Sequence, residues 1–214
     1  MTSLSTRVRW RNCAAGEVVV DSGDPSDEVY FITEGAVRVV IRTVFGYESI
    51  LNDLGAGAFF GELAAIDGDR RSANVTALSR TRLCIVPAAP FMKLVLSSAD
   101  LSRRLLCLLS TRLRAKDERL IEFSVLSVRQ RLIAELLRLS RDRGGGERVL
   151  SPPPPQHVLA GRIGTRRESI SRELTEMSRA GLVTVGRRAI VLRQPEKLRA
   201  EIQARIQGTP AAVS

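Results

Sequence analysis

The chain has 214 residues, of which 44% are hydrophobic and 26% are charged, a composition typical of a globular protein. Its 33 basic and 23 acidic residues give a net charge of +10, which suggests an anionic partner. Two prolines and a lysine interrupt the most apolar run, at 83–96, so a bilayer-spanning segment and a membrane partner are excluded.

The cysteines and the single histidine limit the possible chemistry. Cys13, Cys84 and Cys107 form an odd, scattered set, which is typical of a reducing compartment. Residues 1–11 hold three arginines and no apolar segment, so we expect no secretory signal and predict a cytoplasmic protein. With His157 as the only histidine, neither a zinc site nor a Ser–His or Cys–His pair is expected. We therefore predict no metal, no catalytic residues, no catalytic cofactor and no enzymatic activity.

The charge is unevenly distributed along the chain. Residues 1–126 hold 16 Lys and Arg against 15 Asp and Glu, a net +1, whereas residues 127–214 hold 17 against 8, a net +9. This division favours two modules, with the polyanion-binding surface on the second. We expect most arginines of the second module to attract phosphate in general and to make binding salt-dependent.

Short strands dominate the first part of the chain. They are rich in Val, Ile, Tyr and Phe, and turn-forming residues separate them. Many short strands at even spacing predict a compact antiparallel barrel or roll. The predicted strands are residues 17–20, 29–33, 36–43, 49–54, 75–78 and 82–86.

A candidate anion site lies within this strand-rich region. Gly61 would let backbone amides approach a phosphate closely, and Arg71 offers a planar fork to two phosphate oxygens. Ser72 adds a hydroxyl donor, and Glu62 can accept a hydrogen bond from a ribose hydroxyl. Together these residues suit a ligand that carries one negative charge beside a sugar. The alternative interpretation is an ordinary solvated Arg71.

A long helix is predicted at 99–126, where glycine and proline are absent. Six of its residues are spaced as an a/d heptad seam with one polar member, which favours a two-fold dimer formed with a second copy of the chain. The alternative is a helix that packs only on its own domain, through Leu101, Leu105 and Leu108. The predicted dimer-interface residues are Leu106, Leu109, Leu113, Lys116, Leu120 and Phe123.

A second helix is predicted from Ser127 to Leu139, and it begins with a capping box of Ser127 and Gln130. A polar, glycine-rich loop is predicted at 141–146, and an extended proline-rich linker at 152–155 follows it.

A helix-turn-helix is predicted over 157–180. A short helix and a glycine-containing turn precede a helix at 166–180, which would begin with a capping box of Thr165 and Glu168. Strands at 182–185 and 189–192 would then form a hairpin wing with Arg187 and Arg188 at its tip.

The second helix of this motif carries residues suited to reading DNA bases. Arg167 sits at the end that enters the major groove, and Glu168 and Arg172 share a face away from the apolar stripe. Arginine can bond guanine at two atoms, and glutamate accepts from cytosine. Phosphate contacts are expected from Arg166, Arg187 and Arg188. The alternative is a solvated helix face on which Glu168 and Arg172 form an ion pair.

Two segments carry a resemblance to a known family. Gly61-Glu62-Leu63, followed by Arg71-Ser72-Ala73, resembles the phosphate-binding cassette of cyclic-nucleotide-binding domains. Residues 167–172, Arg-Glu-Ser-Ile-Ser-Arg, resemble the recognition helix of the cyclic-AMP receptor protein (Crp/Fnr) family of transcription regulators. The resemblance covers about residues 10–193. It implies an α+β fold with an antiparallel β-roll at 1–98, a dimerisation helix at 99–126 and a winged helix-turn-helix at 127–214.

The resemblance also implies partners and residue roles. Backbone groups of Gly61 and Leu63 would lie near the cyclic phosphate, Arg71 and Ser72 would bind it, and Glu62 would hold the ribose 2′-hydroxyl. The partners would be double-stranded DNA with a TGTGA-like half-site, a second copy of the chain, a cyclic nucleotide and RNA polymerase. The DNA-binding residues would be Arg166, Arg167, Glu168, Ser171, Arg172, Arg187 and Arg188.

The identity of the nucleotide stays open between cAMP and cGMP. The family's cyclic-AMP sensors often have Thr and Ser facing the purine, where this chain has Lys116 and Asp117. Lysine could donate to guanine O6 and aspartate could accept from N1 and N2, although aspartate could also accept from the adenine amine. The alternative for Lys116 and Asp117 is that they form surface ion pairs with Arg112, Arg114 or Glu118. The alternative for the whole protein is a family member that responds to another effector or to none.

Overall fold

A computed structural model describes residues 8–42 and 48–206. The chain divides into two compact units between Arg112 and Leu113. Residues 1–7 lie outside the described residues, and they make up most of the segment 1–11 in which no secretory signal is expected. Residue 43, the end of the strand predicted at 36–43, also lies outside them. Within them, no helix is both long and apolar enough to cross a membrane.

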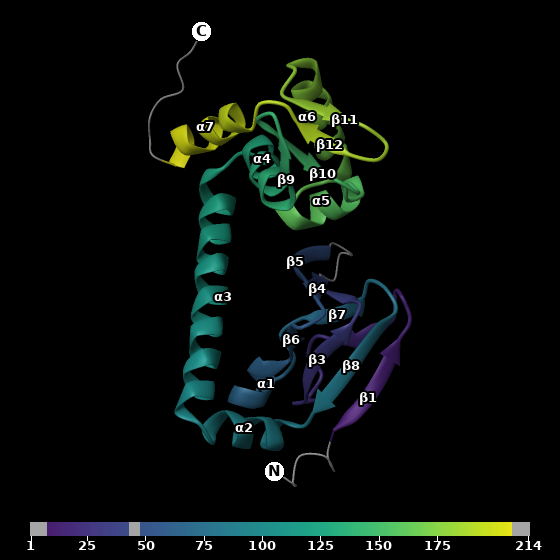
Figure 1. Cartoon of the computed structure of the whole chain (residues 1–214), viewed down its shortest axis with the longest axis vertical. Coiled ribbons are helices and arrows are strands. Elements are labelled where there is room, and N and C mark those ends of the chain that lie inside the picture. Colours follow the sequence, from purple (N-terminus) through teal and green to yellow (C-terminus); the bar gives the residue numbers. More distant parts are fainter. Residues whose placement is uncertain (1–7, 43–47, 207–214) are drawn as a thin grey trace. The chain divides into compact units, whose positions relative to one another are not determined.

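The first unit is built on two antiparallel sheets that pack face to face (Figure 1). One sheet has the order β1 (Arg9–Cys13), β8 (Thr81–Val86), β3 (Val29–Glu34) and β6 (Phe59–Phe60). The other has the order β2 (Val18–Val20), β7 (Asn74–Ala77), β4 (Ala36–Arg42) and β5 (Glu48–Gly55). Residues of both inner faces form one core, among them Tyr30, Val37, Val75 and Leu83. The predicted antiparallel roll is confirmed.

Two strands of this roll escape sequence analysis. The sequence of β1, Arg-Trp-Arg-Asn-Cys, is too polar to predict a strand, yet all five of its residues pair with β8. The two-residue strand β6 is too short to show a pattern, and it pairs with Tyr30 and Phe31 of β3. Pairing with a neighbouring strand therefore defines both elements.

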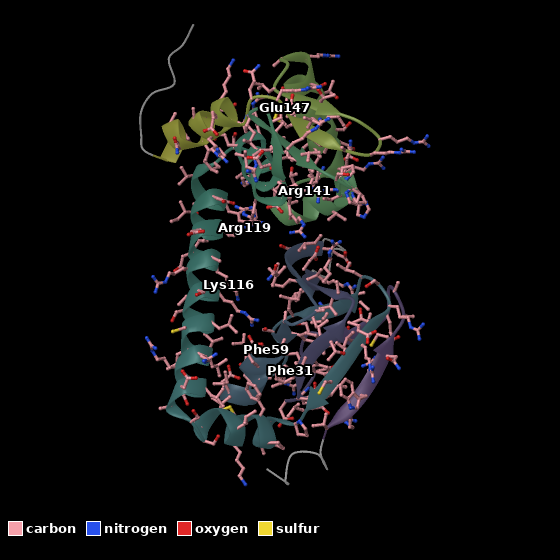
Figure 2. The ribbon with its side chains drawn as sticks, in the orientation of Figure 1. Phe31, Phe59, Lys116, Arg119, Arg141 and Glu147 are labelled. Carbon is pink, nitrogen blue, oxygen red and sulfur yellow. The ribbon has the colours of Figure 1, made fainter. Side chains whose placement is uncertain are left out.

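Two short helices cover the outer face of the first sheet, and neither is predicted. They are α1 (Glu62–Asp67) and α2 (Ala88–Leu96). Ala65 of α1 and Phe91 of α2 pack with Val29, and the rings of Phe31 and Phe59 lie 5.3 Å apart at the same place (Figure 2). Pro90 does not break α2, because it lies in the first turn, where no backbone donor is needed.

The helix α3 (Ala99–Val125) has 27 residues and no buried residue. Leu105 packs partly against the α1 and α2 cluster, so one of the leucines outside the heptad seam does contact its own unit. Leu106, Leu113 and Leu120 of the seam are 65%, 60% and 66% exposed. Large apolar side chains spaced by seven residues are thus left uncovered within the chain.

Besides the last part of α3, the second unit contains four helices and a four-stranded sheet among the residues that the structure describes. Its elements are α4 (Val128–Leu139), β9 (Arg141–Gly144), β10 (Glu147–Leu150), α5 (Gln156–Ile163), α6 (Arg167–Arg179), β11 (Val183–Val185), β12 (Ile190–Leu192) and α7 (Pro195–Ile206). The sheet has the order β11-β12-β10-β9, and one core joins it to the helices. Helices α5 and α6 with the β11–β12 hairpin form the predicted winged helix-turn-helix.

Two local predictions for this unit are wrong or incomplete. The predicted loop at 141–146 is instead the hairpin of β9 and β10, which adds two strands to the wing sheet. Its strand β9 is entirely exposed and has no apolar residue, so no hydrophobic pattern reveals it. Helix α7 is also unpredicted, and it packs on α4 through the buried Leu198.

The two predicted capping boxes have opposite outcomes. Ser127 and Gln130 form theirs, because the Gln130 amide donates to Ser127 Oγ at 3.3 Å and the Ser127 amide donates to Gln130 Oε1 at 3.0 Å. The box predicted for Thr165 and Glu168 does not form, because α6 begins one residue later with Arg166 as its cap. The Thr165 amide instead donates to the carbonyl of Ala160 at 3.0 Å and closes α5.

Candidate functional site

Gly61 connects strand β6 to helix α1 in a conformation that favours glycine. Its φ is 83°, in the left-handed region. A Cβ at this position would lie 2.6 Å from Arg71 Nη1 and 2.7 Å from the carbonyl oxygen of Glu28. The glycine therefore permits both the turn and the close approach of the arginine.

Arg71 is a buried cation, with only 5% of its surface exposed. Its Nη1 donates to the carbonyl of Gly61 at 3.0 Å and its Nη2 to the carbonyl of Glu28 at 2.7 Å. Its Nε donates to Ser26 Oγ at 3.0 Å, and the guanidinium lies 5.4 Å from the centre of the Tyr30 ring. The interpretation of Arg71 as a solvated surface residue is therefore wrong.

The partners of Arg71 orient it without neutralising it. Among the described residues, its hydrogen bonds go to two carbonyls and one hydroxyl, and no carboxylate pairs with it. A guanidinium has five N–H donors, so these three bonds leave two donors available. Burying a charge without a counter-charge is costly, and an anion would supply both the charge and the missing acceptors.

The ring of Tyr30 packs against this guanidinium. Its hydroxyl donates to Glu28 Oε2 at 3.1 Å, and its ring stacks on Phe60 with the centroids 4.9 Å apart. Burial raises the pKa of Tyr30, the Glu28 carboxylate raises it further, and the positive charge of Arg71 opposes both effects. The phenol accordingly stays neutral and keeps its proton for Glu28.

Glu62, the first residue of α1, is likewise only 5% exposed. Arg112 of α3 forms an ion pair with its carboxylate through Nη1. Arg112 Nη2 also donates to the carbonyl of Phe59 at 3.0 Å, and the guanidinium lies over the Phe59 ring. The sequence suggests Arg112 only as a partner of Asp117, because nothing in local spacing links Arg112 to a residue fifty positions earlier.

The other predicted nucleotide contacts are exposed. Leu63 and Ser72 lie on the surface of the first unit. Lys116, labelled on α3 in Figure 2, lies in the second unit and is also exposed. Asp117 follows it on the same helix and is exposed as well. In the part of the chain that the structure describes, neither forms a salt bridge, so the ion pairs considered as the alternative are not present.

The predicted DNA-reading residues share one exposed face of α6. Ile170, Leu174 and Met177 are buried in the core of the unit. On the opposite side Arg167, Glu168, Ser171 and Arg172 are exposed. Glu168 and Arg172 do not form the ion pair of the alternative interpretation. The guanidinium of Arg172 instead lies 3.9 Å from the carboxylate of Glu173.

The wing places two more arginines on the surface. Strands β11 and β12 pair closely, and the Gly186 amide donates to the carbonyl of Ala189 at 2.8 Å to close the turn. Arg187 and Arg188 lie in this turn and are exposed, as is Arg166 before α6. The helix and the wing thus present arginines that point away from the protein.

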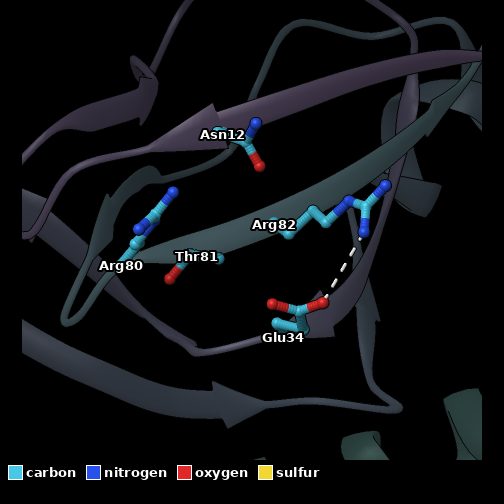
Figure 3. Close-up of a pocket in the computed structure, with 5 residues that line it drawn as sticks. All are labelled: Asn12, Glu34, Arg80, Thr81 and Arg82. Carbon is cyan, nitrogen blue, oxygen red and sulfur yellow. Dashed lines mark ion pairs between the residues drawn. The ribbon is translucent and has the colours of Figure 1, made fainter.

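Two pockets lie outside the cassette. One borders the exposed face of α6 with Arg167, Glu168, Ser171 and Arg172, the predicted recognition face. It is lined by Ser171, Leu174, Thr175, Ser178 and Arg179 of α6 with Gln156 and Val185. The other is a small polar pocket at the start of β8, lined by Asn12, Glu34, Arg80, Thr81 and Arg82 (Figure 3). No group of His, Cys, Asp and Glu that could hold a metal ion occurs within residues 8–42 and 48–206.

Comparison with known proteins assigns both units. Residues 10–98 match the cyclic nucleotide-binding domain family, and residues 130–201 match the Crp-like helix-turn-helix domain family. The cyclic AMP receptor protein of Thermus thermophilus is 30% identical over 179 residues, which are 84% of this chain and 81% of that protein. The chain belongs to the Crp/Fnr family of transcription regulators.

Further relatives agree with this assignment. The CRP-like cAMP-activated global transcriptional regulator of Mycobacterium tuberculosis is 25% identical over 186 residues, 86% of this chain and 83% of that one. The crystal structure of a CRP/FNR-family transcriptional regulator from Thermus thermophilus matches with a TM-score of 0.72 and 26% identity. That match covers 92% of this chain and 100% of the other. Members of the family are DNA-binding transcription regulators rather than enzymes.

The contact between Gly61 and Arg71 in this Crp/Fnr regulator can be tested against Gly68, the glycine that caps the other end of α1. Gly68 has a φ of 74°, and a Cβ there would meet no atom within 4 Å. Gly68→Ala should lower the free energy of unfolding by about 1 kcal/mol, the cost of a left-handed alanine. Gly61→Ala should cost at least about 2 kcal/mol, because its Cβ also displaces the guanidinium. Urea unfolding measures both, and equal losses would show that the close approach is unimportant.

Proposed function

We propose that this chain acts as a homodimer that binds a cyclic nucleotide in its roll and, in that state, a palindromic DNA site with TGTGA-like half-sites. The observation that carries the nucleotide assignment is the buried guanidinium of Arg71, oriented by neutral oxygens and left without a carboxylate partner in the described chain. A cyclic phosphate carries the single negative charge that this arrangement lacks.

The neighbours of Arg71 suit the rest of such a ligand. Backbone groups of Gly61 and Leu63 would lie near the phosphate, and the exposed Ser72 would add a hydroxyl donor. Glu62 would accept from the ribose 2′-hydroxyl, because a carboxylate has room for several donors and Arg112 occupies one oxygen. The ribose and Arg112 would then share one carboxylate, which gives the ligand a direct effect on α3.

The homodimer is supported by the uncovered seam of α3. Leu106, Leu113 and Leu120 are exposed at heptad spacing, and an identical helix related by two-fold symmetry would cover them. The other predicted interface residues are Leu109, Lys116 and Phe123. Phe123 is 40% exposed, although its ring also packs against the turn at Gly164.

DNA would be read by α6 in the major groove. Arg167, Glu168 and Arg172, with Ser171, face outward at the end of the helix that enters the groove. Arg166, Arg187 and Arg188 would contact backbone phosphates, and Gln156, Thr175 and Arg179 beside the recognition face offer further donors. In a dimer the two α6 helices would bind half-sites about 34 Å apart, one turn of DNA.

Nucleotide control requires that the ligand bind the DNA-competent state more tightly than the other state. Two Crp relatives are named for cyclic AMP, which makes cAMP the first ligand to test. Lys116 and Asp117 make cGMP the second, since both are exposed and their donors and acceptors complement guanine. RNA polymerase would be the further partner through which the bound dimer acts on transcription.

The first prediction concerns Arg71 and its sequence neighbour. Arg71→Gln should weaken cAMP binding about 100-fold or more, because it removes a charge-assisted fork from a buried site. Arg70→Gln is the matched control, because Arg70 is exposed and its side chain donates to the carbonyl of Gly23. The affinity of this variant for cAMP should differ from that of the wild type by less than about twofold. Calorimetric titration measures both, with circular dichroism as the test of folding. Unchanged binding by a folded Arg71→Gln variant would refute the site.

The second prediction concerns the purine. If Asp117 reads guanine, the wild-type protein should bind cGMP more tightly than cAMP, and Asp117→Ala should remove about tenfold of that preference. Glu118→Ala removes a neighbouring carboxylate from the same helix and serves as the control. Calorimetry with both nucleotides gives the ratio. Equal affinities that Asp117→Ala leaves unchanged would contradict the guanine hypothesis.

The third prediction separates base reading from phosphate attraction. Arg172→Ala should cost about 1–3 kcal/mol on a TGTGA-type palindrome and should relax the preference at one base position. Arg188→Ala should instead weaken binding to all sequences and reduce the salt slope by about 1. Fluorescence anisotropy over a salt series, with and without nucleotide, distinguishes the two. If the affinity of the protein for DNA is the same with and without nucleotide, the alternative of another effector or of none is favoured.

A further inference from the structure

A fully buried carboxylate joins three helices of the second unit. Glu135 of α4 is inaccessible to solvent. Arg119 of α3 donates to its Oε2 at 2.9 Å, and Arg162 of α5 donates to its Oε1 at 3.3 Å. Arg138 of α4 also bonds Oε2, so one carboxylate receives arginines from α3, α4 and α5. The cassette and the recognition face do not include this cluster.

Arg119 makes the contacts that reach the helix-turn-helix directly. Its Nη2 donates at 2.9 Å to the carbonyl of Arg162, the second-last residue of α5. Carbonyls in the last turn of a helix have no partner within the helix, so Arg119 satisfies one of them. Its Nη1 also lies 3.2 Å from Glu122, one turn along α3. The planar fork of Arg119, a residue labelled on α3 in Figure 2, thus bridges the buried carboxylate and the end of α5.

A second contact lies one turn further along α3. Phe123 packs on the turn between α5 and α6, where a Cβ on Gly164 would lie 2.8 Å from the ring. Gly164 has a φ of 63°, in the left-handed region. The guanidinium of Arg131 of α4 lies over the same Phe123 ring, 5.2 Å from the ring centre. Residues four apart share a helix face, so Arg119 and Phe123 present one surface to the start of the helix-turn-helix.

We infer that Arg119 is a positioning residue for DNA recognition: it holds α5 and the following turn against α3 and so sets where α6 stands relative to the dimer helix. This inference rests on the proposed homodimer, because only in a dimer does that position decide the separation of the two recognition helices. Arg119 lies outside the apolar core of the unit, and Glu135 keeps Arg138 and Arg162 when Arg119 is shortened. The helix-turn-helix should therefore fold without it.

The test compares full-length Arg119→Ala with Arg104→Ala. Arg104 is an exposed arginine of the same helix that pairs with Asp100 four residues away, so it controls for the loss of a helical charge. Three DNA probes are used: a palindrome with half-sites one turn apart, the same half-sites with two base pairs inserted between them, and a single half-site. Hydrogen exchange of residues 160–165 is measured in parallel without DNA.

Arg119→Ala should bind the single half-site within about twofold of the wild-type affinity. Its preference for the correctly spaced palindrome should fall by about tenfold or more, and amides at 160–165 should exchange faster. Arg104→Ala should match the wild type in all three respects. A variant that merely unfolds would instead lose half-site binding and palindrome binding together.

A spacing preference and exchange rates like those of the wild type in Arg119→Ala would overturn the inference. If the wild-type protein shows no spacing preference, the proposed homodimer on a palindrome fails, and hydrogen exchange alone then decides whether Arg119 holds the turn. If Arg119→Ala does not fold, Arg119→Lys is measured in its place. Lysine keeps the charge beside Glu135 but lacks the fork, so it should still lose part of the preference and speed exchange at 160–165.

Discussion

The first unit depends on a buried positive charge that its neighbours orient without neutralising. Carbonyl oxygens of Gly61 and Glu28 fix two edges of the Arg71 guanidinium, and the Tyr30 ring lies beneath it. Such an arrangement destabilises the protein without an anion, because a cation removed from water gains little from neutral dipoles. The same cost would favour the binding of an anion in the proposed site, since the anion would recover more free energy there than at a solvated arginine. The left-handed Gly61 is part of this close packing, because any side chain there would displace the guanidinium.

The carboxylate next to this cation connects the cassette to the long helix. Glu62 begins α1, directly after the glycine, while its partner Arg112 lies on α3 and also bonds the carbonyl of Phe59. A ligand hydroxyl that approached Glu62 would change the environment of Arg112 without touching it. A single ion pair of low exposure would therefore link the proposed ligand site to the helix that carries the predicted dimer seam, and this pair lies within the first unit.

Sequence patterns predict the parts of this protein that repeat or that form local motifs. Segments rich in Val, Ile, Tyr and Phe between turn residues predict six strands, and a resemblance to a known phosphate-binding cassette points to Gly61, Glu62 and Arg71. The same patterns cannot reveal Arg112 and Glu62, because fifty residues separate them and only the fold brings them together. Strand β9 is not predicted from the sequence, because it contains no apolar residue and is held in the sheet by backbone pairing with β10. The capping box at Thr165 fails for a related reason, since its backbone amide already closes α5 and moves the start of α6 by one residue.

The arginines of the second unit divide into two groups that the net charge of +9 conceals. Arg129, Arg138, Arg162 and Arg193 form ion pairs with glutamates of the same unit, and two of those glutamates, Glu135 and Glu173, are buried. Their charge mainly holds helices and strands together, so they contribute little to attraction at a distance. Arg166, Arg167, Arg187 and Arg188 lie exposed and have no ion pair among the described residues. The expectation that most arginines here attract phosphate is therefore too broad. In the proposed complex, the positive potential that DNA would meet is concentrated at the start of α6 and the tip of the wing, where the same residues would also set the register of binding.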